Sequence, residues 1–274
     1  MPEKIPVNPT LPPIPENIMP GAEPVFIDQG KVGILFLHGY TGSPYEGREF
    51  AYHFSQKGFG VWVPLLPGHG TTPEALETVS SQDWLTAAEQ YYLAMKVQYD
   101  RVVVCGQSMG GALALHIAAN HPVDALITLA AAIFIKDWRL HLLPVVRRVI
   151  SYYYKSNGPD IHSKTAKKNS ASYEKYPLSS LVEFLDLIEQ VRGELPSVNA
   201  PSLLVHSRRD HTIDYDNLDY IYNHIGSSFK KTLTLTESYH VISVDQEKEL
   251  IFSEIENFFQ SGIIPASSPA TLKK

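Results

Sequence analysis

The stretch Arg101-Val-Val-Val-Cys-Gly-Gln-Ser-Met-Gly-Gly-Ala-Leu-Ala-Leu-His-Ile-Ala-Ala-Asn120 decides the architecture of this chain. Its apolar start, Val102–Cys105, is typical of a buried parallel strand. The chain then turns at Gly106, carries Ser108 at the tip of the turn, and continues through Gly110 into small and apolar residues. Such a run predicts a helix of small residues. The expected order is strand, tight turn, helix.

The Gly-x-Ser-x-Gly pattern at this turn is typical of a nucleophile elbow, which exposes a serine hydroxyl at the carboxyl edge of a sheet. So tight a turn strains the serine backbone, and side chains at Gly106 and Gly110 would collide across it. The helix that follows leaves free N–H groups at its start, below the hydroxyl. The alternative is a glycine-rich turn with an incidental serine. The flanking strand and helix favour the elbow, with Ser108 as nucleophile.

The bulk composition is that of an ordinary globular protein. The chain has 274 residues, of which 44% are hydrophobic and 19% charged. This length suffices for one large α/β domain or two small ones. The net charge of −6 leaves no basic footprint, so a nucleic-acid partner is not expected.

The single cysteine and the N-terminus bear on the compartment. Cys105 excludes an intrachain disulfide and suits a reducing environment. The proline-rich start lacks the apolar core of a signal peptide, and no apolar run approaches the ~20 residues that span a bilayer. We therefore expect a cytoplasmic protein without a transmembrane segment. The sequence leaves open whether it is a monomer or a homodimer.

Strands and helices alternate from Glu23 onward, after a proline-rich arm over residues 1–22 that is extended on the body or partly disordered. This alternation predicts an α/β fold with one mostly parallel, doubly wound sheet. Residues 23–132 and 194–261 would form its core, and 262–274 a loose tail. The expected strands are Pro24–Asp28, Val32–Leu37, Gly60–Leu65, Arg101–Gly106, Ala125–Ala130, Ser202–Ser207 and Thr232–Thr236. The expected helices are Tyr45–Gln56, Asp83–Gln98, Ser108–Asn120, Tyr215–His224 and Gln246–Gln260.

Residues 133–193 interrupt the alternation. About seventy residues separate two consecutive strands, where a simple crossover needs about a dozen. The segment contains helical stretches, expected at Trp138–Tyr153 and Leu178–Val191, and many tyrosines and lysines. Because both its ends belong near the carboxyl edge of the sheet, we predict an inserted helical lid over that edge. It would set substrate choice without joining the chemistry.

A serine hydroxyl needs a neighbouring base, which in this arrangement comes later in the chain. Among the eleven histidines, His240 follows the last predicted strand and precedes the final helix, in a loop at the carboxyl edge. Seven of the others lie on helices or at their ends, within a strand or in the lid: His53, His116, His121, His141, His162, His206 and His224. His211 is the one serious rival.

The predicted acid is Asp210, a few residues after the penultimate strand. It would accept the imidazole N–H, fix the tautomer and stabilise the imidazolium. Asp214 is an alternative acid, although it could instead cap the following helix. Asp245 is expected to cap the last helix.

The remaining element is an oxyanion hole. One N–H should come from Met109, the residue after the nucleophile, and the other from Tyr40 in the loop Leu-Phe-Leu-His-Gly-Tyr-Thr-Gly-Ser-Pro over residues 35–44. His38 and His69 are expected to be structural, holding this loop and the Pro-Gly-His-Gly turn at residues 67–70.

These motifs together are specific. His38-Gly39-Tyr40, Pro67-Gly68-His69-Gly70, Gly106-Gln107-Ser108-Met109-Gly110, Arg209-Asp210 and Ser238-Tyr239-His240-Val241 resemble those of the α/β-hydrolase superfamily. The chain looks most like its bacterial monoacylglycerol lipases and carboxylesterases, from about Gly21 to Phe259. The resemblance implies the same nucleophile, acid, base and two amides. It departs at Gln107, where that group more often has leucine, and in the lid, which leaves the substrate open.

The expected activity is hydrolysis of short- or medium-chain esters or monoacylglycerols through an acyl-enzyme, with Tyr40, Ile133, Trp138 and Val241 contacting the substrate. A second interpretation keeps the fold and changes the bond to an amide, a C–C bond or a feruloyl-type ester. A third is a non-catalytic ligand-binding protein, although such proteins tend to lose a triad member. No metal cluster or nucleotide-binding glycine loop is present in the sequence, so no metal or cofactor is expected.

Overall fold

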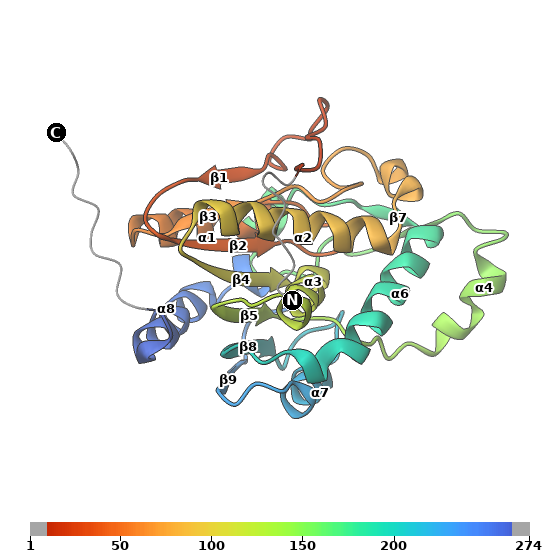
Figure 1. The fold of residues 1–274 in the computed structure, drawn as a ribbon. Coiled ribbons are helices and arrows are strands. Elements are labelled where there is room, and N and C mark those ends of the chain that lie inside the picture. Colours follow the sequence, from red (N-terminus) through yellow and green to blue (C-terminus); the bar gives the residue numbers. More distant parts are fainter. Residues whose placement is uncertain (1–9, 265–274) are drawn as a thin grey trace.

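The computed structural model describes residues 10–264 and is built around a seven-stranded sheet (Figure 1). The strand order is β1-β3-β2-β4-β5-β8-β9. Only the edge strand β1 runs antiparallel to its neighbour, and the other pairs are parallel. The mostly parallel sheet predicted from the sequence is confirmed. The strands are β1 Val25–Ile27, β2 Val32–Leu37, β3 Gly60–Val63, β4 Arg101–Gln107, β5 Ala125–Leu129, β8 Ser202–Ser207 and β9 Lys230–Leu235.

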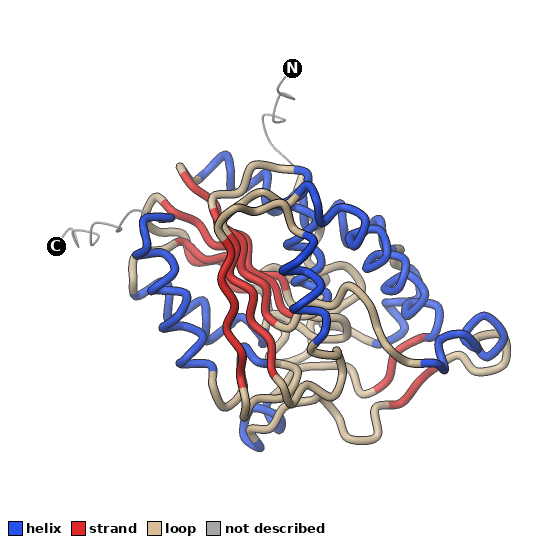
Figure 2. Tube along the Cα trace, turned by 90° about the horizontal axis from the view of Figure 1, so that it is seen from below, coloured by secondary structure: helices blue, strands red, loops and turns tan. Residues whose placement is uncertain are grey.

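Helices cover both faces of the sheet, as Figure 2 shows. One apolar cluster joins α1 and α8 to the sheet, and a second joins α2, α3, α6 and α7 to its other face. Burial on both faces explains why the central strands are continuous apolar runs. The helices are α1 Tyr45–Gln56, α2 Ser81–Gln98, α3 Met109–Asn120, α6 Leu178–Glu194, α7 Asp216–His224 and α8 Lys248–Phe258.

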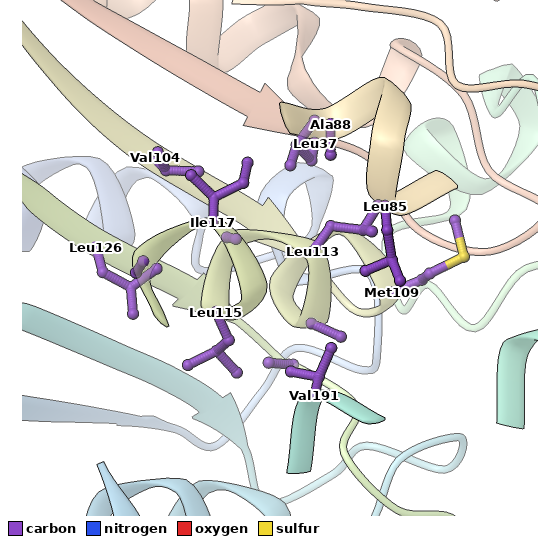
Figure 3. Packing of buried hydrophobic residues seen from close by; sticks show 14 of the residues in the cluster. Leu37, Leu85, Ala88, Val104, Met109, Leu113, Leu115, Ile117, Leu126 and Val191 are labelled. Atoms are coloured by element: carbon purple, nitrogen blue, oxygen red, sulfur yellow. The ribbon is translucent and has the colours of Figure 1, made fainter. Parts of the chain in front are cut away.

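Helix α3 lies inside the protein, and its residues 109–118 are all buried. Its residues are small or apolar on nearly all sides, so it presents no broad polar face to water. In Figure 3, its side chains pack among those of α2, β2 and α6, including Leu85, Ala88, Leu37 and Val191. The helix that follows the elbow serine is therefore held from several sides.

The register of the sheet places the loops of the later site side by side. Leu37, the last residue of β2, pairs with Gly106 of β4. Ser207 at the end of β8 pairs with Leu235 of β9. The loops that follow these four strands consequently leave the sheet at one edge.

The inserted segment differs from the prediction in its first half. Residues 138–154 do not form one long helix but a 3-10 turn, Trp138–Leu142, the short α4, Leu143–Val146, and the strand β6, Tyr152–Tyr154. Pro144 is tolerated here because it lies in the first turn of α4. The β6 strand pairs with β7, Lys175–Pro177, in a separate two-stranded sheet. In Figure 1, α4 lies beyond α6 at the right of the molecule.

The second half of this segment contains the short α5, Lys164–Asn169, and then α6. Helix α6 begins at Leu178, as predicted, and extends three residues further than expected, to Glu194.

The ends of the described chain are attached to the body. Residues 10–22 form no helix or strand, but the Met19 N–H donates to the Gly70 carbonyl at 2.8 Å and Ala22 is fully buried. Ile264 is also buried and Ile263 packs against the same apolar cluster, so the start of the predicted loose tail is attached to the body, although Gly262 is exposed. The rest of the predicted arm, residues 1–9, and of the predicted tail, residues 265–274, lies outside the described residues.

Candidate active site

Ser108 sits at the turn between β4 and α3 in the strained geometry expected of an elbow. Its φ is +56° and its ψ is −114°, values that a non-glycine residue rarely adopts. The glycines on either side of this turn are required, because a side chain at either position would collide with the main chain. A Cβ on Gly106 would lie 1.9 Å from the Gly110 carbonyl oxygen, and one on Gly110 would lie 1.9 Å from the Leu37 carbonyl oxygen. The predicted collision across the turn is confirmed.

The three side chains singled out in the sequence lie in one hydrogen-bonded chain. The Nε2 atom of His240 is 2.9 Å from Ser108 Oγ, and its Nδ1 atom is 2.7 Å from Asp210 Oδ2. Ser108 and His240 are each 7% exposed, and the Asp210 side chain is fully buried. These distances are those of a nucleophile, a base and an orienting acid.

The Asp210 carboxylate accepts several hydrogen bonds besides the one from His240. Its Oδ1 accepts the main-chain N–H groups of Thr212 and Ile213, both at 2.8 Å, and Oδ2 lies 3.2 Å from His206 Nε2. Burial by itself would raise the pKa of Asp210, but the charge of His240 and the bonds from both histidines hold that pKa well below its usual range. Asp210 is thus ionised at neutral pH. The sequence placed His206 in a strand and gave no sign of this contact.

The contact with Asp210 also shifts the pKa of His240. Burial favours the neutral imidazole, but the adjacent Asp210 carboxylate more than offsets this and raises the pKa of His240 above its ordinary 6.5. Its main chain is also fixed, because the Gln107 side chain donates to the His240 carbonyl at 2.9 Å. Gln107, the residue that departs from the family pattern, therefore links the elbow to the histidine loop.

The competing candidates lie elsewhere. Asp214 accepts the N–H of Asp216 at 2.9 Å, at the start of α7, and forms an ion pair with Lys136. His211 has a 60% exposed side chain whose Nδ1 is 3.0 Å from Asp160 Oδ1. Neither is hydrogen-bonded to Ser108.

Asp245 does not cap α8, contrary to the prediction. The cap position is Glu247, and the buried Asp245 carboxylate accepts N–H groups of Tyr239, His162, Ser163 and Gln246 at 2.8–2.9 Å. It joins the loop before His240 to the inserted segment.

The loop after β2 is held by two buried histidines, as expected. The Leu66 N–H donates to His38 Nε2 and the Thr41 N–H to His69 Nε2, both at 3.1 Å. Burial lowers the pKa of His38 well below 6.5 and that of His69 to about 4, so both rings are neutral acceptors. The main-chain N–H groups of Tyr40 and Met109 donate no hydrogen bond to any of residues 10–264.

Glu46, which no sequence motif marks, lies beneath the same loop. Its Oε2 accepts the Gly39 N–H at 2.7 Å, and the residue is 7% exposed. Burial raises the pKa of Glu46 to about 7, although the Gly39 bond opposes this. Its position in the first turn of a predicted helix gave no hint of a contact with the loop.

A cavity of about 1170 Å³ opens above Ser108. Three of the predicted substrate contacts line it: Tyr40, whose ring stacks on Phe184 at 4.9 Å, Val241, and Trp138, which is 72% exposed. Ile133 does not line the cavity. Its side chain is fully buried in the α3 cluster and its N–H donates to Asn217, so the structure gives it a packing position instead of the expected substrate contact.

The inserted segment 133–193 contacts the site directly. The Asp160 carbonyl accepts the N–H groups of His240 and Val241, both at 3.1 Å. Tyr173 donates its N–H to the Thr41 carbonyl at 3.0 Å, and the Ser180 hydroxyl lies 2.6 Å from that of Tyr40. Residues 10–264 contain no cluster of three or more metal-ligating side chains. No helix in this range is long and apolar enough to cross a membrane.

Comparison with known proteins identifies the family. Residues 29–247 match the family model described as "Serine aminopeptidase, S33". The chain is 32% identical over 243 residues to a thermostable monoacylglycerol lipase of a Bacillus species, covering 88% of this chain and 96% of the relative. It is 27% identical to a carboxylesterase of Bacillus subtilis, covering 87% and 96%.

Solved structures agree with this assignment. One from the metagenome-derived lipolytic enzymes LipS and LipT superposes with a TM-score of 0.83 at 32% identity, covering 89% of this chain and all of that one. The monoacylglycerol lipase of Paleococcus ferrophilus, at 14% identity and a TM-score of 0.73, shares the fold and covers 87% and 98%. The chain therefore belongs to this α/β-hydrolase family. It is an enzyme of the ester-hydrolase type.

Proposed function

We propose that the protein hydrolyses carboxylic esters through an acyl-enzyme. Ser108 is the nucleophile, His240 is the general base and then the general acid, and the Asp210 carboxylate orients the His240 ring. The observation that carries the proposal is the chain of hydrogen bonds at 2.9 and 2.7 Å in a site that opens into the cavity. The main-chain N–H groups of Tyr40 and Met109 would bind the oxyanion.

In the acylation step, Ser108 Oγ attacks the ester carbonyl carbon while His240 Nε2 takes the hydroxyl proton. The carbonyl oxygen becomes an oxyanion. When the tetrahedral intermediate collapses, the C–O bond to the alcohol breaks and His240 returns the proton to the leaving oxygen. Water then attacks the acyl-enzyme in the same way, its proton passing through His240 to Ser108, and the carboxylic acid leaves. Asp210 keeps its negative charge throughout and stabilises the imidazolium.

Short- or medium-chain esters, or monoacylglycerols, are the proposed substrates. The cavity wall offers aromatic and aliphatic side chains to an acyl chain, among them Tyr40, Leu181 and Phe184. The named activities of the two Bacillus relatives support the same class. Aminopeptidase activity, which the family description names, would need a free carboxylate that binds the N-terminal ammonium of a peptide. The Glu46 and Asp160 carboxylates on this wall are already hydrogen-bonded to the protein.

The test combines a variant with a covalent probe. Ser108→Ala should fold normally and lose turnover of chromogenic esters by at least about a thousandfold, because the triad acts as a unit. A fluorophosphonate should label Ser108 of the unaltered enzyme and leave the variant unlabelled. Ser156→Ala, a serine on the same cavity wall, is the matched control and should keep both properties. Full activity in Ser108→Ala, or labelling at another residue, would contradict the proposal.

A further inference from the structure

Lys155 brings a cationic group to the wall of the catalytic cavity. It directly follows β6, and its Nζ donates to the hydroxyl of Thr41, the residue after the proposed oxyanion donor Tyr40. The residue is only half-buried because the cavity reaches it. The Thr41 hydroxyl, which accepts from this ammonium, donates to no described residue and has its own proton available.

The other charged groups on the cavity wall are satisfied within the protein. Lys136 pairs with Asp214 and Asp216, and Arg139 pairs with Asp137. The Asp160 carboxylate accepts hydrogen bonds from His211 and Thr212, and the Asp210 carboxylate accepts one from His240. Across residues 10–264, no carboxylate lies within 4 Å of Lys155 Nζ or of Lys167 Nζ, which lines the same cavity. Lys155 and Lys167 therefore form no ion pair among the described residues, although both line the cavity.

Glu46, which also lines the cavity, is the carboxylate whose charge acts on Lys155, but it lies beyond ion-pair distance from the Lys155 ammonium. Its Oε2 is bonded to the Gly39 N–H, and its Oε1 is packed against Gly42, where an added Cβ would lie 2.0 Å away. Burial lowers the pKa of Lys155 to about 8, with Glu46 opposing the shift. At neutral pH, Lys155 is therefore protonated, and hence positively charged, in most of the molecules.

We propose that Lys155 binds an anionic oxygen group of the substrate, a carboxylate or a phosphate, with the Thr41 hydroxyl as second donor. This rests on the proposed ester hydrolysis and narrows its substrate class to esters that carry a negative charge. Hydrogen bonds between charged groups are about twice as strong as neutral ones, so such a pair can govern selection.

The anion should lie close to the ester along the substrate. Thr41 is held rigidly: its N–H donates to His69, its carbonyl accepts from Tyr173, and its φ is +61°. Because Thr41 adjoins Tyr40, the group that it and Lys155 bind is near the oxygen of the reacting carbonyl. A short acyl or alcohol arm would span this separation.

Two matched pairs of esters test the proposal and separate the side on which the anion lies. On the acyl side, mono-4-nitrophenyl glutarate is compared with 4-nitrophenyl pentanoate. On the alcohol side, 1-butyrylglycerol 3-phosphate is compared with 1-butyrylglycerol. The quantity measured is the ratio of kcat/KM, anionic over neutral, for the unaltered enzyme, Lys155→Met and Lys155→Arg. Lys175→Met, which removes an ammonium that pairs with Glu74 outside the cavity, is the matched control.

In at least one pair, the ratio should fall about tenfold in Lys155→Met, stay largely intact in Lys155→Arg and not change in Lys175→Met. The unaltered enzyme supplies a second measurement that needs no variant. Glutarate or glycerol 3-phosphate should inhibit hydrolysis of the neutral esters competitively, whereas glutaramide and glycerol should not.

Equal ratios in Lys155→Met and the unaltered enzyme for both pairs, or no inhibition by either anion, would overturn the inference. If the unaltered enzyme fails to hydrolyse the neutral and the anionic esters alike, the proposed function itself is wrong. Turnover of the esters with an anionic-over-neutral ratio that does not depend on Lys155 refutes the anion site alone.

Discussion

The carbonyl oxygen of Asp160 accepts the main-chain N–H of His240 at 3.1 Å, although the two residues are eighty positions apart. The Asp160 carboxylate meanwhile accepts from the N–H and Nδ1 of His211, both at 3.0 Å, next to Asp210. One residue of the inserted segment thereby holds the loops of both the proposed base and the proposed acid. The segment thus supports the site as well as lining its cavity.

Asp160→Ala should therefore lower kcat about tenfold with little change in KM, because three side-chain bonds to the acid loop are lost. The negative charge of Asp160 also helps to raise the pKa of His240. Removing it should move the acid limb of the pH profile toward lower pH, by about half a pH unit. The measurement is kcat and KM on one short-chain ester between pH 5 and pH 9.

Asp160→Asn separates the two contributions, since the amide oxygen can still accept from the His211 N–H. It should recover most of kcat while keeping the shifted limb. Asp186→Asn, an exposed charge on α6 that does not line the cavity, is the control and should leave the profile unmoved. An unshifted limb in both Asp160 variants would mean that Asp160 only stabilises the fold.

The unaltered enzyme should lose activity as the pH falls through the pKa of His240. The imidazole must be neutral to take the Ser108 proton, and its pKa is raised above 6.5 by Asp210. The midpoint of kcat/KM on a neutral ester should thus lie above pH 6.5, with activity increasing toward higher pH. Glu46 titrates in the same range, at about 7.

Glu46→Gln distinguishes these two groups. The amide oxygen can still accept the Gly39 N–H, but the residue no longer titrates. The acid limb should persist and shift slightly downward, because the Glu46 charge also supports the imidazolium. Disappearance of the limb in this variant would assign it to Glu46.

The assignment of the acid is tested by two neighbouring substitutions. Asp210→Asn should lower kcat/KM by up to about ten thousandfold, since the amide favours the wrong tautomer of His240. Asp214→Asn changes the same group in a residue whose carboxylate accepts from the Asp216 N–H and pairs with Lys136, and it should retain most activity. A larger loss in Asp214→Asn would overturn the choice between them.

The sequence was informative wherever local pattern and chain order decide the structure. The apolar strands β2 and β8 and the helix α1 have the predicted bounds, because burial on both faces or on one helical face is written in their residues. Ser108, Asp210 and His240 each follow a predicted strand closely in the sequence. Parallel pairing then brings those places to one edge, and the three side chains lie together there.

The sequence was uninformative where distant segments meet. Asp245 looks like a helix cap in its local context, yet its carboxylate binds N–H groups of residues 162 and 163. Glu46, His206 and Asp160 act through contacts with other loops, which no periodicity encodes. The predicted helix over residues 138–153 failed because several of its large apolar residues stay exposed, among them Val145 and Val149, so no packed face stabilises it.

The dependence of kcat/KM on the length of the acyl chain tests whether the cavity wall contacts that chain. Deleting residues 133–193 would disturb the triad through Asp160, so a single substitution is the cleaner experiment. Leu181 lines the cavity from α6, and Leu181→Ala removes apolar surface that an acyl chain can contact. In the unaltered enzyme, each added methylene from acetate to octanoate should improve kcat/KM by a fraction of the ~0.8 kcal/mol of full burial. That gain should shrink in Leu181→Ala while acetate hydrolysis changes little.

The control is Leu250→Ala, which alters a half-exposed leucine on α8 and should keep the original gain per methylene. If Leu181→Ala slows every ester by the same factor, Leu181 supports the fold of the site and does not contact the acyl chain.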